Sequence, residues 1–415
     1  MPAAVLTIGT EVTRGELLNT NSAWLSEALC EMGFSVVEHV SVEDDPAQII
    51  GAVRRLASYC DLVVCTGGLG PTSDDLSAQA VAEAAGLILE LHQPSLERID
   101  ARLKSRGREL LEIQKKQAYL PRGCEVLQND EGTAPGFCVS LASSKVCCLP
   151  GVPREMKAMF DSYLRPGLAE LIHSGLYQLR FNTYGRPEAE LAMMLQELEQ
   201  SEKQITFGYR AHIPVVEVKL LAKAQTAAEA KELATVAAEK VKAKLGSLVF
   251  SERGESYAAY VGQLLRQEKR RLAVAESCTG GMIASMLTDV AGSSEYFLFG
   301  GVTYSNAAKA QVLGVSEDLL SKHGAVSTQV ARAMAEGAMR VAGADMAVST
   351  TGIAGPGGGS EEKPVGMVCF GLADRNGTVY SDTKYFSGSR DRIRTLASYY
   401  ALFMIADRLR SKAAK

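Results

Sequence analysis

A serine in the last third of the chain has the residue type and the neighbours needed for acyl transfer. Ser277 follows an apolar strand predicted at residues 272–276 and precedes Gly280 and Gly281, which open a predicted helix. Glycines let a ligand approach the backbone closely, and the unpaired N–H groups of a first helical turn can stabilise an oxyanion. We expect the backbone from Thr279 to Gly281 to supply these donors.

Lys309 and Tyr304 are the candidates for the proton transfers. Asn306 is predicted to cap a second helix, so Lys309 would lie about three residues inside it. The positive end of the helix dipole disfavours an ammonium there, and such a lysine loses its proton more easily and can act as a base. The alternative is that Ser277 only caps a helix and Lys309 is a solvated surface lysine, because spacing alone does not bring the two together.

The elements that would position these residues belong to a multidomain α/β chain. Its 415 residues, 47% of them apolar, predict about two to four domains. The net charge of −4 argues against a nucleic-acid backbone as the main partner. Nine cysteines without CxxC or Cys/His spacing predict reduced thiols, with Cys147 and Cys148 in a buried strand. No signal peptide or transmembrane segment is evident, so we expect a cytoplasmic protein.

Residues 1 to 170 alternate apolar strands with helical patterns, which predicts βαβ units and a largely parallel sheet. Ligands of such sheets bind at the carboxyl ends of the strands. Those ends carry Glu11, the glycine-rich loop that begins at Gly67, and, at another strand end, Glu155. We expect Glu155 to face the same cleft, although a glutamate in a first helical turn is ordinarily just solvated.

The glycine-rich loop has the shape of a phosphate site, since it enters a predicted helix. The glycines concerned are Gly67, Gly68 and Gly70. Asp74 and Asp75 follow them, and paired carboxylates there would hold a hard cation. The alternative is that the two aspartates only complement the dipole at a helix N-terminus.

Two further regions complete the chain. Residues 176–250 predict a small α+β domain of one β-α-β-β-α unit, in which Arg186, Glu188 and Glu190 are expected to be surface charges. From about residue 255 the α/β alternation resumes. There the loop Ser349–Gly359 is rich in glycine and proline, so it either wraps a ligand or turns sharply.

The end of the chain carries one more candidate. Asn376 and Gly377 predict a β-hairpin, and Arg390 follows it at the start of the last helix. An arginine there would bind a substrate phosphate, or it is a surface arginine.

These motifs, taken in order, resemble the CinA family (competence/damage-inducible protein A) over essentially the full length. The resemblance is carried by the Thr20-Asn21-Ser22 helix start, TGGLGPTSDD, NDEGTAPGF, LPGVPREM, AESCTGG, YSNAAK, LGV, GAVS, TGIAGPGGG and KPVG. It implies a molybdopterin-binding-like three-layer α/β/α domain at 1–172, a small KH-like α+β domain at 173–252 and an α/β/α domain similar to nicotinamide mononucleotide deamidases at 253–415. No GXXG clamp occurs between residues 171 and 250, so RNA binding is not carried over.

The resemblance also implies roles for individual residues of the C-terminal domain. Similar proteins hydrolyse the carboxamide of nicotinamide mononucleotide to nicotinate mononucleotide and ammonia, without a cofactor, in pyridine nucleotide recycling. Ser277 matches the nucleophile and Lys309 the base, and Tyr304 and Thr351 match assisting positions. The remaining matched positions would hold the substrate, and they are Thr279, Gly280, Gly281, Gly352, Gly355 and Arg390.

A second activity is implied for the N-terminal domain, which in the family is associated with a metal-dependent pyrophosphatase acting on ADP-ribose. Asp74 and Asp75 would hold the divalent cation. The whole set of matching positions is Glu11, Asn21, Gly67, Gly68, Gly70, Asp74, Asp75 and Glu155. The run after Glu11 departs from the usual glutamate followed by leucines. A non-catalytic nucleotide- or pterin-binding protein of competence or damage response is the third alternative, and a homodimer without nucleic-acid or membrane partners is expected.

Overall fold

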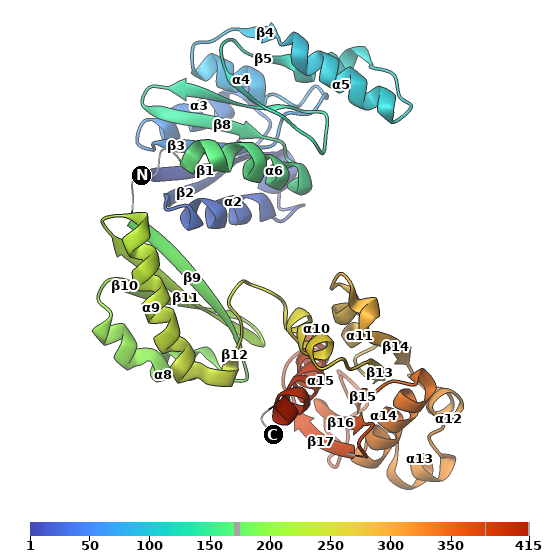
Figure 1. The fold of residues 1–415 in the computed structure, drawn as a ribbon. Coiled ribbons are helices and arrows are strands. Elements are labelled where there is room, and N and C mark those ends of the chain that lie inside the picture. The colour runs from blue at the N-terminus through green and yellow to red at the C-terminus, as the bar shows by residue number, and fades with distance from the viewer. Residues whose placement is uncertain (170–174, 378, 414–415) are drawn as a thin grey trace. The chain divides into compact units, whose positions relative to one another are not determined.

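The computed structural model describes residues 1–169, 175–377 and 379–413 (Figure 1). The chain divides into two compact units, and each is treated by itself. One unit comprises residues 1–178 with 221–237, and the other comprises residues 179–220 with 238–415. Three larger sheets and one two-stranded sheet form the β-structure of the described residues.

The N-terminal sheet has six strands in the order β2-β1-β3-β8-β7-β6. Strands β2, β1, β3 and β8 pair in parallel, whereas β7 pairs antiparallel with both β8 and β6. The strands are β1 (Pro2–Ile8), β2 (Ser35–Val42), β3 (Leu62–Thr66), β6 (Glu125–Leu127), β7 (Gly136–Leu141) and β8 (Ser144–Leu149). A separate antiparallel pair is formed by β4 (Leu89–Leu91) and β5 (Tyr119–Pro121).

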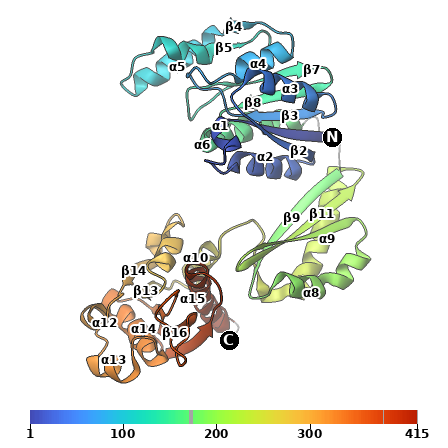
Figure 2. The same cartoon turned by 180° about the vertical axis from the view of Figure 1, so that it is seen from behind.

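Helices cover both faces of this sheet, as the two opposite views show (Figures 1 and 2). One face of β1 packs with α3 and α4, and the other packs with α2 and α6. Since both faces are covered, the central strands are continuous apolar runs. The helices are α1 (Thr10–Thr13), α2 (Thr20–Glu31), α3 (Pro46–Ala57), α4 (Ser77–Ala84), α5 (Gln93–Ser105), α6 (Pro153–Met159) and α7 (Arg165–Ala169), with a 3-10 helix at Glu112–Ala118 and a π-helical turn at Phe160–Leu164. The expected three-layer α/β/α domain is confirmed.

The middle of the chain forms a four-stranded sheet in the order β10-β11-β9-β12. Its elements follow one another as the predicted β-α-β-β-α unit, closed by a short fourth strand. They are β9 (Gly175–Tyr184), α8 (Glu188–Ser201), β10 (Ile205–His212), β11 (Val215–Ala224), α9 (Ala227–Leu245), a 3-10 turn at Gly246–Leu248 and β12 (Val249–Ser251). The predicted small α+β fold is therefore confirmed.

The C-terminal sheet has the order β14-β13-β15-β16-β17, with β13 parallel to both of its neighbours and the last three strands antiparallel. Helices α10, α11 and α15 pack on one face, and α12, α13 and α14 on the other. The strands are β13 (Leu272–Glu276), β14 (Phe297–Val302), β15 (Met346–Gly352), β16 (Met367–Asp374) and β17 (Val379–Tyr385). The helices are α10 (Tyr257–Gln267), α11 (Met282–Thr288), α12 (Asn306–Leu313), α13 (Glu317–His323), α14 (Thr328–Ala342) and α15 (Arg390–Ala413), with a 3-10 turn at Ser293–Glu295.

The predicted hairpin at Asn376 and Gly377 joins β16 to β17, and Gly377 has the positive φ of 81° that favours glycine. Both the hairpin and the α/β/α architecture of the C-terminal domain are confirmed. Among the described residues, no helix combines the length and the apolar character needed to cross a membrane.

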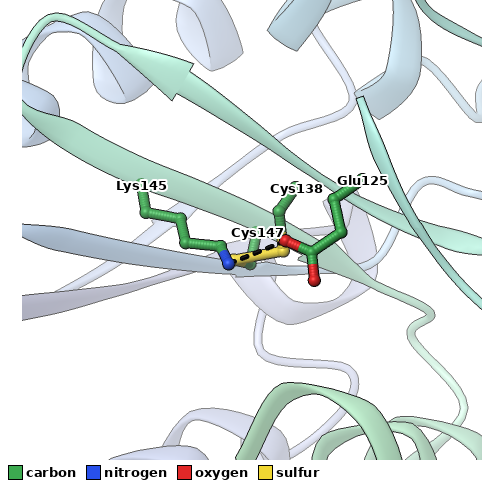
Figure 3. Close-up of a disulfide and its surroundings, with 4 residues drawn as sticks. All are labelled: Glu125, Cys138, Lys145 and Cys147. Carbon is green, nitrogen blue, oxygen red and sulfur yellow. Dashed lines mark hydrogen bonds and ion pairs between the residues drawn. A yellow bond between two sulfur atoms is a disulfide. The ribbon is translucent and has the colours of Figure 1, made fainter. Parts of the chain in front are cut away.

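One expectation about the cysteines is wrong. Cys138 on β7 and Cys147 on β8 lie directly opposite each other in the antiparallel pair, and the structure joins them in a disulfide (Figure 3). In the same sheet, Lys145 of β8 forms an ion pair of 2.7 Å with Glu125 of β6, the residue opposite Cys138. The strand register brings the two thiols together, and sequence spacing could not show it because it says nothing about which residues face each other across a hairpin. Cys148 is buried as predicted.

The disulfide predicts the result of a thiol titration. Protein purified without reductant and then unfolded should react through seven free thiols, and prior reduction should raise the number to nine. A Cys138→Ser variant should show eight thiols under both conditions, because it removes one cysteine and frees Cys147. Nine reactive thiols in the unreduced wild type would contradict the pairing.

Candidate functional site

The carboxyl end of β13 brings Ser277 and Lys309 together. Lys309 Nζ lies 3.2 Å from Ser277 Oγ, within hydrogen-bonding distance. The parallel pairing of β13 with β14 produces this contact, since the N–H of Thr303 donates to the carbonyl of Glu276 and α12 begins soon after. The alternative of a solvated surface lysine is therefore wrong, because the side chain of Lys309 is only 1% exposed.

Lys309 is buried, and no carboxylate of the described residues pairs with it. Besides Ser277, its ammonium donates to the carbonyls of Thr303 at 2.9 Å and Tyr304 at 3.2 Å. Burial lowers the pKa of Lys309 from the ordinary lysine value of 10.5, because desolvation disfavours the charged form. The predicted cap of α12 is displaced by one residue, since the Ser305 hydroxyl, and not Asn306, accepts the N–H of Ala308.

The turn after Ser277 requires its two glycines. Gly280 and Gly281 have φ values of 62° and 92°, a region that side chains other than glycine rarely adopt. Their N–H groups are already used, however, because Gly280 donates to the carbonyl of Ser277 and Gly281 to the carboxylate of Glu276. The expectation that these two groups stabilise an oxyanion is wrong.

Among the described residues, the N–H groups of Cys278 and Thr279 form no hydrogen bond with another residue. The N–H of Ser277 itself pairs with the carbonyl of Thr350, and Thr279 is fully buried, with its hydroxyl 2.8 Å from that of Thr350. The Cys278 side chain packs into the apolar core, and burial raises the pKa of its thiol to about 12. Cys278 is therefore a poor nucleophile, while its backbone N–H follows the nucleophile directly.

Tyr304 and Arg390 lie together at the exposed side of the site. The Arg390 guanidinium donates to the hydroxyl of Tyr304 at 3.3 Å and to the carbonyl of Gly355 at 2.8 Å. Tyr304 is 62% exposed. The first residues of α15, the loop after β15 and the segment before α12 thus meet at one place. Arg390 and Gly355, the expected substrate-binding residues, lie there beside Tyr304, the expected assisting residue.

Thr351 does not join this group in the described structure. Its hydroxyl donates to the carbonyl of Ala325 at 2.8 Å, and it has no hydrogen bond to Ser277 or Lys309. Gly352 ends β15 against Met367, where an added Cβ would lie 2.7 Å from the Met367 carbonyl oxygen. Thr351 is thus bound to the segment between α13 and α14, and Gly352 leaves no room for a side chain beside the start of β16.

Two residues near the nucleophile were missed by the sequence reasoning. Glu276 is 1% exposed, and its carboxylate accepts N–H groups of the turn and of α11. Arg394 donates to the carbonyl of Thr279 at 2.9 Å. A carboxylate at the end of an apolar strand was a usable signal for Glu276, whereas Arg394 is separated from Thr279 by most of the domain sequence.

The N-terminal domain has a separate cavity of 580 Å³ at the carboxyl ends of its parallel strands. It gathers every predicted residue of the N-terminal site, and these are Glu11, Asn21, Gly67, Gly68, Gly70, Asp74, Asp75 and Glu155. Two of the glycines are required by geometry, because an added Cβ would lie 2.0 Å from Ile8 O at Gly67 and 2.3 Å from Ser77 Oγ at Gly68.

Hydrogen bonds hold three of the residues that line this cavity in place. The Asn21 amide donates to the Thr66 hydroxyl and the Gly151 carbonyl, so it joins the ends of β3 and β8. Glu155 accepts the Asn129 amide at 2.7 Å. Asp75 accepts the N–H of Thr72 at 2.8 Å.

Asp74 and Asp75 precede α4, which begins only at Ser77. They lie between the glycine-rich loop and the helix, where the sequence places them. They line the cavity together with Glu11, Asp44 and Glu155. No group of three or more His, Cys, Asp or Glu within the described ranges has metal-ligating geometry, and a cation bound by the two aspartates stays a prediction.

The folds and sites define a three-domain α/β protein with two separate candidate sites. Three family models match it: "Probable molybdopterin binding domain" at residues 4–170, "Damage-inducible protein CinA KH domain" at 179–251 and "CinA C-terminal domain" at 254–409. The CinA-like protein of Geobacter sulfurreducens is 42% identical over 412 residues, covering 99% of each chain. That of Anaeromyxobacter dehalogenans is 42% identical over 416 residues, covering 99% of this chain and 100% of the other. The chain belongs to the CinA family.

Solved structures of family members match parts of the chain. The CinA protein of Thermoplasma acidophilum is 36% identical and covers 40% of this chain and 96% of its own, with a TM-score of 0.38. The competence/damage inducible protein of Agrobacterium tumefaciens is 42% identical and covers 37% of this chain and 96% of its own, with a TM-score of 0.35.

The burial of Lys309 predicts a pH-dependent cost to stability. Since its folded-state pKa lies below the unfolded value near 10.5, the unfolded chain binds more protons and wild-type stability rises with pH up to that value. Lys309→Met removes this dependence. The free energy of unfolding of the variant relative to wild type should therefore be more favourable at neutral pH than at about pH 10, as measured by urea unfolding. The exposed Lys322→Met is the control, and a pH-independent difference would contradict the burial of a titrating amine.

Proposed function

We propose that this protein hydrolyses the carboxamide of nicotinamide mononucleotide to nicotinate mononucleotide and ammonia, in pyridine nucleotide recycling. The observation that carries the proposal is the 3.2 Å contact between Ser277 Oγ and the buried Lys309 Nζ. A serine hydroxyl becomes a nucleophile when an adjacent base takes its proton. A desolvated lysine with a lowered pKa is such a base.

In the first half of the reaction Ser277 Oγ bonds to the carboxamide carbon while its proton passes to Lys309 Nζ. The carbonyl electron pair moves onto the oxygen. Lys309 then gives the proton to the amide nitrogen, the C–N bond breaks and ammonia leaves. In the second half, water attacks the ester on Ser277 with Lys309 again as base, and the C–Oγ bond breaks as Ser277 regains its proton.

The oxyanion would be stabilised by the N–H of Cys278, the residue that follows the nucleophile. One such donor is worth about 3 kcal/mol in a site closed to water. Tyr304, Arg390 and the loop at Gly355 would hold the ribose and the phosphate, because the guanidinium and the phenol already lie together and point to an anionic group there.

The proposal predicts that Ser277→Ala lowers the rate of ammonia release from nicotinamide mononucleotide by about a thousandfold or more. Cys278→Ala should stay within about threefold of wild type, because the reaction needs only the backbone of that residue. The wild-type kcat/KM should rise with pH and level off below 10.5, where Lys309 becomes neutral. Ammonia release by Ser277→Ala at the wild-type rate would refute the assignment.

A second function is favoured by the charge of the N-terminal cavity. Five carboxylates line it, and no lysine, arginine or histidine is among its described lining residues. A pyrophosphate could bind between those carboxylates only with divalent cations to neutralise both. The cavity therefore supports a metal-dependent hydrolysis of ADP-ribose, with Asp74 and Asp75 as the cation ligands.

The test is hydrolysis of ADP-ribose with added Mg²⁺ or Mn²⁺. Asp74→Asn should lower the rate by about a hundredfold, since one ligand charge is lost, whereas Ser277→Ala should hydrolyse ADP-ribose like wild type. A chelator should abolish this activity and leave ammonia release unchanged. Binding of ADP-ribose or a pterin to folded protein without turnover would instead favour the non-catalytic alternative for this domain.

A further inference from the structure

The carboxyl group of Glu276 is buried, and within the described ranges it has no basic partner. It is the last residue of β13 and 1% exposed. Its Oε2 accepts the N–H groups of Gly281 at 3.0 Å and Ile283 at 3.2 Å, and its Oε1 accepts that of Ala284 at 2.9 Å. No lysine or arginine in the described parts of the chain forms an ion pair with it. The carboxylate is therefore stabilised by the backbone N–H groups at the start of α11.

These bonds close a small arch around the nucleophile. The chain leaves the sheet at Glu276, passes through Ser277 and Cys278, and returns at Gly281 to the carboxylate of the residue it left. Arg394 holds the arch from outside through the carbonyl of Thr279. With the N–H groups of Gly280 and Gly281 occupied, the N–H of Cys278, the residue that follows Ser277, is a donor that an oxyanion could use.

The same residue also sets the position of the base. The backbone carbonyl of Glu276 accepts the N–H of Thr303 at 2.8 Å, and the carbonyl of Thr303 accepts Lys309 Nζ at 2.9 Å. A displacement of Glu276 would therefore move the nucleophile and its base relative to each other.

We propose that Glu276 is a positioning residue of the amidase, whose carboxylate fixes the arch so that Ser277 Oγ meets Lys309 and the Cys278 N–H faces the developing oxyanion. This inference rests on the proposed function of the same site. It goes beyond that function in assigning the geometry of the nucleophile to a side chain that touches neither substrate nor base.

Glutamine is the sharpest substitution, because it keeps the shape of the side chain and replaces one accepting oxygen by an NH₂ donor. Either the Ala284 bond or the Gly281 and Ile283 bonds are then lost, and the NH₂ group opposes a backbone N–H. We expect Glu276→Gln to lower kcat for ammonia release by about tenfold to a hundredfold, since small displacements of reacting groups cost that much. KM should change by less than about twofold, because Tyr304 and Arg390 are untouched.

Two controls separate positioning from stability. Glu295→Gln removes a surface carboxylate of the same domain that pairs with Arg266, and it should leave kcat and the melting temperature unchanged. Leu265→Ala opens a cavity in the core of the same domain, so it should lower the melting temperature and leave kcat unchanged below it. Glu276→Gln with a kcat within about threefold of wild type would overturn the inference.

A second readout is independent of the substrate. Phenylmethylsulfonyl fluoride forms a bond between its sulfur and Ser277 Oγ, with loss of fluoride and of the serine proton. We expect slower labelling of Ser277 in Glu276→Gln than in wild type, detected by peptide mass spectrometry. If wild type is labelled but releases no ammonia, the proposed substrate is wrong and the role of Glu276 stands. Equal labelling rates would overturn that role.

Hydrogen exchange on the wild type tests the arch if the variant fails to fold. The amides of Gly281, Ile283 and Ala284 should exchange slowly, because each donates to a buried carboxylate. The first-turn amides of Glu317 and Asp318 in α13 are the reference, since α13 begins at exposed residues. Exchange at Gly281, Ile283 and Ala284 as fast as at this reference would overturn the inference.

Discussion

The removal of one amine from water is the constraint on which the C-terminal domain depends. A lysine buried beside a hydroxyl and two carbonyls, without a carboxylate, is costly in its charged form. Lys309 is buried at the place where three loops meet, so the desolvation of its amine costs stability there. The surrounding sheet and helices keep the amine in position. If Lys309 were exposed to solvent, its pKa would stay near the ordinary value of 10.5 and the amine would be protonated at neutral pH. A protonated amine could not take the proton of Ser277.

The two ionisable side chains near Ser277 have different kinds of partners. The carboxylate of Glu276 is satisfied entirely by backbone amides, while the amine of Lys309 is surrounded by acceptors that do not neutralise it. The two groups therefore do not form an ion pair that would hold the lysine protonated. Because the carboxylate binds the turn and the amine binds Ser277 and two carbonyls, one site holds both a stable turn and a base next to the nucleophile.

The architecture could be predicted because it follows from local patterns, whereas the pairing of Ser277 with Lys309 was implied only by the family resemblance, since their spacing leaves it open. Apolar runs, glycine turns and the capping residues before α12 lie close together in the chain, and the prediction was wrong there by one residue, at Ser305. Contacts between distant segments were not predictable in this way. The Cys138–Cys147 pairing depends on hairpin register, the Thr351 hydroxyl turns to Ala325, and Arg394 reaches Thr279 across the domain.

The strand order has a further consequence for both sites. In the C-terminal sheet β14 and β15 lie on opposite sides of β13, and in the N-terminal sheet β2 and β3 lie on opposite sides of β1. At such a topological switch point the connections leave in opposite directions and open a crevice that the sheet itself does not fill. Ser277 follows the central strand in one case, and Gly9 does so in the other, beside the carboxylate-lined cavity. Substitutions in the loops can therefore change the residues that line each crevice, while the packing of the strands below stays the same.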